Sequence, residues 1–293
     1  MNTTPLNPDF AAISENPRSA SQSLLRQSGQ EDEIPIDPVL LCELNDWPLS
    51  YAELDGPGVL ATTFTDNDRI QIVLNVQGTD NKVGLSSDTT IRRRQRFSLA
   101  HELGHAWFSS HNNATLQKKL TTEENPHRFR YQRIREIQAN EFASELLMPQ
   151  THVMTILKTF KWQDFGTSLE DFCIKFDVSS LAAGFRLAKI APFAAIAIYF
   201  RDDGKSRQLP SWSPDFQEAG FFFQPGNDAP SGSLVQRLIA QPDSKVNKIR
   251  HRNARAWFQN KVADQYILDE WVVRLGKYGF LAFLALTEDQ DYN

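Results

Sequence analysis

The sequence predicts an α+β protein in which a mainly helical domain is followed by a mixed α/β domain. Apolar residues recur with a helical period in residues 97–108 and again in 136–149. Farther along the chain, near-continuous apolar runs of strand length take over, and 193–200 and 271–286 are the clearest. This change of pattern, near Ala191, predicts two domains of different construction.

The change of pattern also sets the expected domain limits. Residues 1–30 are rich in Ser, Asn, Pro and Gln and have little periodicity, which is typical of a flexible leader and leaves too few residues for a DNA-binding module. The first domain is expected at 31–190 and the second at 191–293.

Turn and cap residues delimit the expected elements of the first domain. Asp88 is a suitable N-cap for the helix that contains 97–108, and Pro149 is a suitable end for the second helix. The other expected elements are a helix at 37–44, strands at 59–64 and 70–76, and a small helical extension made of two helices at 169–176 and 180–187.

The second domain is expected to mix strands and helices. The apolar run 193–200 is followed by a turn signal, and the run 271–286 is interrupted at Gly276 and Gly279. The remaining expected elements are a strand at 221–223 and helices at 234–240 and 256–263.

Residues 101–105 read HELGH, an HExxH motif inside the first long helix. His101 and His105 are four positions apart, so both imidazoles lie on one helix face and can reach a single metal ion. Glu102 lies beside that face, where its carboxylate can take a proton from a water whose pKa the metal has lowered. The pattern is typical of zinc-dependent peptide hydrolysis, whereas a chance HExxH string consists of solvated helix residues.

The surroundings of the motif favour a metal site over a chance match. Residues 98–100 and 106–108 would pack the far side of the helix into a core. Gly104 costs a helix about 1 kcal/mol relative to alanine. We therefore expect a neighbouring backbone or a substrate to come close to Gly104.

A catalytic zinc site needs a third protein ligand and an open fourth position. His111 lies where the metzincin pattern HExxHxxGxxH has its third histidine, and Met148 with Pro149 could imitate the methionine turn of that class. Phe108, however, stands where metzincins have the glycine that ends the helix, and phenylalanine is poorly suited to a left-handed conformation.

Glu136 is the favoured third ligand. It opens the second helix, and Asn140 lies one turn farther on, so a glutamate ligand with a polar neighbour can face the first helix. Glu141 and Glu145 are alternatives, and Glu136 can also be read as an acidic residue that favours the dipole at a helix start.

These residues resemble the ImmA/IrrE family of metallopeptidases. The resemblance rests on RFSLAHELGH at 96–105, the ExxANxFA pattern that starts at Glu136, and LLMP at 146–149. It extends to PIDPVL at 35–40, IQIVLN at 70–75, FDVS at 176–179 and FRL at 185–187, and so covers about residues 30–190.

The resemblance implies a compact zincin-like domain, with His101, His105 and Glu136 as zinc ligands and Glu102 as general base. Manganese can occupy similar ligand sets. Family members typically cleave a separate helix-turn-helix repressor and so switch on stress-response, phage or mobile-element genes. An appended second domain in such members resembles a sensor arrangement.

The loop between His105 and Glu136 departs from the family in its length. It carries PHRFRY at 126–131, in which His127 or Tyr131 is a candidate to stabilise the oxyanion of peptide hydrolysis. The favoured interpretation of both is an ordinary loop residue.

Composition places the chain among globular proteins. It has 293 residues, of which 41% are hydrophobic, and a formal net charge of -5 that argues against a generally nucleic-acid-coating surface. Cys42 and Cys173 are far apart, so a reducing compartment fits better than a disulfide framework. No apolar run reaches the length of a membrane span, and we expect a cytoplasmic protein.

Three basic clusters raise a different hypothesis. They are Arg92 to Arg94 with Arg96; Arg128, Arg130, Arg133 and Arg135; and Lys245, Lys248, Arg250, Arg252 and Arg255 beside Trp257 and Phe258. Basic residues interleaved with aromatics can bind single-stranded nucleic acid through phosphate contacts and base stacking. The third cluster is therefore a candidate nucleic-acid sensor, although ion pairing within an acidic protein is the favoured interpretation.

Two function hypotheses result. The favoured one is a zinc peptidase that makes a limited cut in a helix-turn-helix repressor. The alternative is a non-hydrolytic regulatory module that binds a repressor or single-stranded nucleic acid. The intact Glu102 favours the first, because a pure binding module does not need that carboxylate.

Overall fold

The helices and strands of the chain group into two units. The computed structural model describes residues 16–55, 60–66, 69–111 and 128–288. Contacts between residues assign Met1–Lys158 and Lys175–Val178 to the first unit, and Thr159–Ile174 and Ser179–Asn293 to the second. The domain limits predicted from the sequence lie between residues 30 and 31 and between residues 190 and 191. They refer to segments that fold independently, so they stay predictions.

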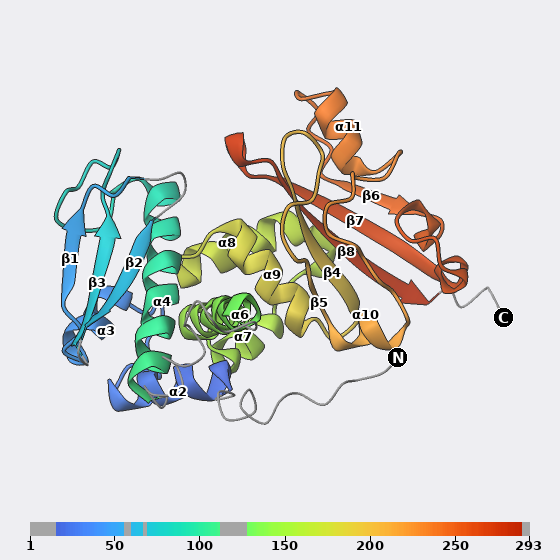
Figure 1. The fold of residues 1–293 in the computed structure, drawn as a ribbon. Helices are drawn as coiled ribbons and strands as arrows, with labels where there is room; N and C mark the ends of the chain where they lie inside the picture. Colours follow the sequence, from blue (N-terminus) through green and yellow to red (C-terminus); the bar gives the residue numbers. More distant parts are fainter. Residues whose placement is uncertain (1–15, 56–59, 67–68, 112–127, 289–293) are drawn as a thin grey trace. The chain divides into compact units, whose positions relative to one another are not determined.

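The first unit consists of a three-stranded sheet and helices. Its elements are α2 (Pro17–Gln27), α3 (Pro38–Leu44), β1 (Leu49–Ala52), β2 (Ala61–Asp66), β3 (Arg69–Asn75), α4 (Thr89–His111), α6 (Arg128–Leu147) and α7 (Gln150–Leu157). The strand order is β1-β3-β2, with β1 parallel and β2 antiparallel to the central β3. Helix α4 lies between this sheet and α6 (Figure 1).

Local sequence signals account for these elements. Asp37 caps α3 by accepting a hydrogen bond from the backbone N–H of Val39, and Pro38 occupies the first helical position. In the central strand, Ile72 and Leu74 are fully buried. Helix α6 ends directly before Met148 and Pro149, as predicted.

Helix α2 differs from the flexible leader expected for residues 1–30. Asn16 caps this helix, and Pro17 stands at its first position. Ala20 and Leu24, one turn apart, are fully buried, and Leu25 is nearly so. A narrow stripe of only three apolar side chains in a Ser- and Gln-rich segment carries little periodic signal, which explains the difference. Residues 1–15 lie outside the described residues.

The second unit is built on a five-stranded sheet. Its elements are η1 (Trp162–Asp164), α8 (Phe165–Phe176, whose last two residues belong to the first unit), α9 (Ser180–Ile190), β4 (Ala194–Phe200), β5 (Ser211–Trp212), α10 (Pro214–Glu218), α11 (Leu234–Ala240), β6 (Lys248–His251), η2 (Ala254–Ala256), η3 (Lys261–Gln265), β7 (Tyr266–Arg274), η4 (Gly276–Tyr278) and β8 (Phe280–Glu288). The strand order is β5-β4-β8-β7-β6, and every pair is antiparallel. The predicted α+β class is confirmed.

Two predictions for the second unit were wrong. Residues 221–223 do not pair with another strand. Phe221 and Phe223 are buried while Phe222 is 71% exposed, so this unpaired segment has the alternating burial that is typical of a strand. The helix expected at 256–263 is replaced by η2 and η3, two short 3₁₀ turns on either side of Trp257 and Phe258. Within the described residues, no helix is both long and apolar enough to cross a membrane.

Candidate metal centre

Helix α4 presents two histidines on one face. Its first turn is capped by Asp88, whose Oδ1 accepts a hydrogen bond from the backbone N–H of Ile91 at 2.9 Å. The apolar residues around the motif are buried; they are Leu99, Ala100, Leu103, Ala106, Trp107 and Phe108. The core therefore fixes the rotation of α4, and with it the direction in which His101 and His105 point.

Gly104 brings α6 close to these histidines. A Cβ atom on Gly104 would lie 3.1 Å from Cδ1 of Phe142 and 3.2 Å from Cα of Ala139. The two helices thus meet at backbone contact distance, as the sequence suggested for Gly104. Glu136 lies almost one turn before Ala139 and reaches across to the histidines.

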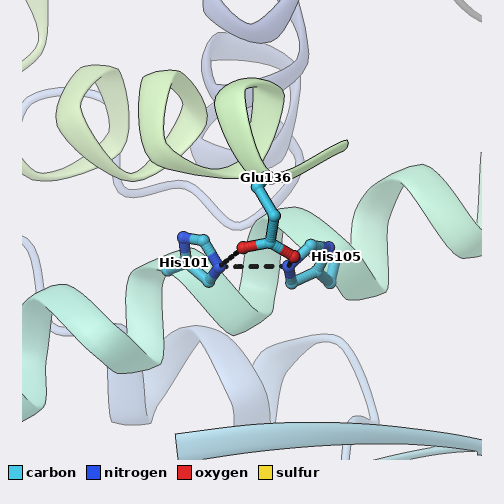
Figure 2. Close-up of side chains that lie close together, drawn as sticks. All are labelled: His101, His105 and Glu136. Atoms are coloured by element: carbon cyan, nitrogen blue, oxygen red, sulfur yellow. Dashed lines mark hydrogen bonds and ion pairs between the residues drawn. The ribbon is translucent and has the colours of Figure 1, made fainter. Parts of the chain in front are cut away.

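Figure 2 shows the two imidazoles of α4 converging on the carboxylate of Glu136 from α6. The Nε2 atoms of His101 and His105 are 3.0 Å apart. His101 Nε2 lies 3.3 Å from Glu136 Oε2, and His105 Nε2 lies 3.3 Å from Oε1. One ligand atom from each residue falls within 4.8 Å of the other two, so the group could hold a metal ion.

Asn140 orients one of the imidazoles. Its Oδ1 lies 3.1 Å from His101 Nδ1. With the amide oxygen as acceptor, Nδ1 carries a proton, and in the neutral ring the lone pair of Nε2 points toward His105 and Glu136. A hydrogen bond of this kind holds a metal-binding histidine in the tautomer that it needs.

A metal site needs an ionised carboxylate and neutral imidazoles. The charges within the group favour the required state of Glu136 but oppose that of His101. Hydrogen bonds from His101 and His105 hold the pKa of Glu136 well below its usual range, so this carboxylate is ionised. Burial acts to lower the pKa of His101, but the hydrogen bond to Glu136 and the charges of Glu102 and Glu136 outweigh burial and raise it. A proton on His101 therefore competes with a metal ion.

The donor set fits a catalytic zinc site. Two imidazole nitrogens and one carboxylate are a known catalytic ligand set for zinc, with a fourth position left for water or substrate. The side chains of His101 and His105 are only 16% and 15% exposed, whereas that of Glu136 is 59% exposed. The group is therefore covered on the α4 side and accessible beside Glu136.

Glu102 is held by a residue that the sequence did not single out. Its Oε2 accepts a hydrogen bond from the hydroxyl of Thr63 on β2 at 2.7 Å, and its backbone oxygen lies 3.3 Å from the same hydroxyl. Thr63 precedes Glu102 by 39 residues. Only the packing of β2 against α4 brings them together, and no local motif marks that contact.

The alternative third ligand, His111, lies on the same unbroken helix. Helix α4 continues through Phe108 to His111, without the turn that metzincins make at this point. A residue six positions after His105 is about 9 Å farther along the axis and about 240° around it. The backbone at residue 111 is therefore displaced from the face that carries His101 and His105, and the side chain of His111 lies outside the described residues.

Glu141 and Glu145 are not part of the group. Both follow Glu136 on α6, and among the described residues only His101, His105 and Glu136 place their ligand atoms within reach of one ion. Of the oxyanion candidates, His127 and the side chain of Tyr131 lie outside the described residues.

The first basic cluster has a structural partner. Arg92, Arg93 and Arg96 on α4 all form ion pairs with Asp177, at 3.1, 3.1 and 3.3 Å. Arg96 is 5% exposed and also donates to the backbone oxygen of Ile36. This cluster therefore anchors the first half of α4 rather than presenting charge to a ligand.

The third basic cluster is also engaged with acidic neighbours. Arg250 bonds to both carboxylate oxygens of Asp269, and Arg255 bonds to Asp264. Lys248 lies 4.6 Å from the ring centre of Trp271. These contacts favour the ion-pairing interpretation, and a nucleic-acid signal finds no support in them.

Comparison with known proteins finds a family model that matches part of the chain. Residues 81–188 match the model of the peptidase M78 family, which is described as the IrrE N-terminal-like domain. Residues 81–188 are similar to an IrrE N-terminal-like domain. The matched residues include His101, Glu102, His105 and Glu136, and the family is one of metal-dependent peptidases.

The fold of the IrrE N-terminal-like domain and of the rest of the chain has a solved counterpart. A Mycobacterium tuberculosis transcriptional regulator matches with a TM-score of 0.60 at 14% sequence identity, over 93% of this chain and 75% of that one. At this identity the likeness extends to the fold alone. No curated protein sequence matches the chain.

Proposed function

We propose that this protein is a zinc-dependent endopeptidase that makes a limited, regulatory cut in a separate helix-turn-helix repressor. The observation that carries the proposal is the convergence of His101, His105 and Glu136 from two helices. Glu102 follows His101 directly on α4. The match to a peptidase family over 81–188 supports it.

Each residue has a distinct role in this reaction. His101, His105 and Glu136 would hold zinc, or manganese, whose ligand preferences overlap. A bound ion supplies Lewis-acid polarisation of the peptide carbonyl and lowers the pKa of water toward neutrality. Asn140 holds the His101 ring in the tautomer that exposes Nε2.

Glu102 is the proposed general base. Its carboxylate would take a proton from the attacking water and deliver it to the amine of the departing peptide. Thr63 restricts the carboxylate to one orientation by donating a hydrogen bond to Oε2. That contact leaves the other oxygen, Oε1, as the proton acceptor.

A repressor substrate is inferred from resemblance and fold. The resemblance to the ImmA/IrrE family implies such a substrate, and the solved protein of similar fold is itself described as a transcriptional regulator. Cutting the repressor would derepress stress, phage-defence or mobile-element genes. We place the reaction in the cytoplasm because Cys42 and Cys173 are both buried free thiols.

The test compares three forms of the protein on helix-turn-helix repressors encoded near its gene. They are the wild type, Glu102→Gln, and Glu170→Gln, a matched change at an exposed glutamate of α8. We expect one discrete cut by the wild type and Glu170→Gln, and none by Glu102→Gln, with equal zinc content in all three. Mass spectrometry of the products gives the position of the cut.

Two outcomes would redirect the proposal. Repressor binding without cleavage by the wild type would favour the non-hydrolytic regulatory module. Undiminished cleavage by Glu102→Gln would remove Glu102 from the reaction.

A further inference from the structure

The second unit contains a cavity of about 580 Å³, within the range of small-molecule binding sites. Two segments line it, 222–230 and 255–259. Both belong to the second unit, so the cavity shares no residue with the metal centre. It is a candidate site that the proposed peptidase reaction does not use.

Buried aromatic rings support one wall of the cavity and hold it rigid. Phe223, Trp257 and Phe258 are 6%, 7% and 3% exposed. The ring of Trp257 lies 5.9 Å from that of Phe200, and its indole N–H donates to the buried carboxylate of Glu270 at 3.0 Å. Since packing and a hydrogen bond already fix these rings, the wall exists before any ligand arrives.

The segment 222–230 is also fixed, by the buried Ser206. The Ser206 hydroxyl donates to the backbone oxygen of Asn227 at 3.1 Å and accepts from the backbone N–H of Gly226 at 2.9 Å. The backbone N–H of Ala229 donates to the oxygen of Gly204 at 2.8 Å. Gly226 has φ of 92°, a conformation that side chains disfavour. These bonds hold the loop in one shape.

Phe222 leaves a large apolar surface in water at this cavity. Its side chain is 71% exposed, between two buried phenylalanines, and it lines the cavity. Because the loop is held on both sides, Phe222 cannot turn inward without displacing Phe221 or Phe223. An exposed aromatic face on a fixed loop is suited to stacking on a planar ring.

The polar groups of the lining indicate a neutral ligand. Gln224, Asn227 and Gln259 supply exposed amides that can both donate and accept hydrogen bonds. The guanidinium of Arg255 is bonded to Asp264, and Asp228 adds a negative charge. A phosphate or carboxylate would therefore meet no uncompensated positive charge among the described lining residues.

We propose that this cavity binds an uncharged planar nitrogen heterocycle of the nucleobase class. The exposed ring of Phe222 provides a stacking surface, and side-chain amides are the groups that read the hydrogen-bonding edge of a base such as adenine. The proposal does not rest on the peptidase function, because it uses only residues of the second unit.

Calorimetric titration of the full-length protein with adenosine tests the proposal, with AMP as an anionic analogue. The variants are Phe222→Ala and Gln259→Ala in the cavity, and Phe129→Ala as a control at a phenylalanine that is 81% exposed and belongs to the first unit. Thermal unfolding shows that each variant is folded, which we expect because these side chains are exposed.

We expect saturable binding of adenosine and weaker binding of AMP. Phe222→Ala should weaken adenosine binding at least tenfold, which is the scale of one lost stacking contact. Gln259→Ala should weaken it less, and Phe129→Ala should leave it unchanged. Absence of saturable adenosine binding, tighter binding of AMP, or unchanged affinity in Phe222→Ala would overturn the proposal.

Discussion

Gly104 on α4 and Ala139 on α6 meet so closely that a Cβ on the glycine would lie 3.2 Å from Cα of the alanine. This crossing sets the distance between the helices just where Glu136 reaches His101 and His105. The separation of the two helix backbones therefore controls whether all three ligand atoms can meet at one ion.

A side chain at residue 104 should impair metal binding more than folding. In Gly104→Ala, the better helix propensity of alanine, about 1 kcal/mol, offsets crowding against Ala139 and Phe142, so the melting temperature should change little. Zinc affinity should fall because α6 moves outward.

In Gly104→Val, overpacking should add a loss of stability of about 1–3 kcal/mol. Zinc titration and thermal unfolding separate the two effects; equal zinc affinity in all three forms would contradict this account.

Thr63 should act as a positioning residue for Glu102. Thr63→Val keeps the shape but removes the hydroxyl that donates to Oε2 at 2.7 Å, so the carboxylate gains freedom. We expect kcat to fall about 10- to 100-fold, since misplacing a catalytic group by about 1 Å has such a cost, with KM and zinc content nearly unchanged. Thr63→Ser, which restores the donor, should recover most of the activity. A loss of zinc in Thr63→Val would point instead to a structural role.

Zinc binding should weaken as the pH falls. A protonated imidazole has no lone pair for a metal, and the hydrogen bond to Glu136 and the nearby carboxylate charges raise the pKa of His101 above the usual value for histidine, despite burial. As the pH is lowered, the apparent dissociation constant for zinc should therefore start to increase before the pH reaches about 6.5. Below that point it should increase at least tenfold for each further pH unit. Competition with a chromophoric chelator between pH 8 and 5 measures this; a constant affinity down to pH 6 would be incompatible with it.

Asp177 should stabilise the first unit through its charge. It accepts hydrogen bonds from Arg92 and Arg93 and pairs with the buried Arg96. Asp177→Asn keeps the shape, and asparagine tolerates the φ of 48° found here, so the loss of about 1–3 kcal/mol of stability would reflect the charge.

The pH dependence gives an independent check on Asp177. Burial acts to raise the pKa of Asp177, but the hydrogen bonds from Arg92 and Arg93 prevail and lower it below 3.8. Its contribution is present above the unfolded-state pKa and is lost as the pH falls through the lower folded-state value. Denaturant unfolding from pH 7 to 2 should therefore show a flatter acid limb in Asp177→Asn; parallel curves would rule out a role for this charge.

Much of the fold follows from signals that act over a few residues. The cap at Asp88 is confirmed, as are the helix expected at 37–44, the end of α6 before Pro149 and the helix at 234–240, because each depends on local chemistry. The wrong strand at 221–223 and the wrong helix at 256–263 lie where packing of single aromatic rings, rather than periodicity, decides the backbone.

The sequence predicts those parts of the candidate site that depend on a single helix. The spacing of His101 and His105 is set by α4 alone, and Gly104 gave a local sign that another backbone approaches. Thr63 could not be found in the same way, because its contact with Glu102 arises only when β2 packs against α4.

The most direct measurement is the zinc content of the purified protein beside His101→Ala, His105→Ala and Glu136→Ala, with His111→Ala as the control. The ligand atoms of the first three residues lie within reach of one ion, whereas His111 ends α4, six residues after His105. We predict about one zinc per chain in the wild type and in His111→Ala, and loss of zinc in the other three variants. Retention of zinc by Glu136→Ala together with its loss from His111→Ala would contradict the proposed centre.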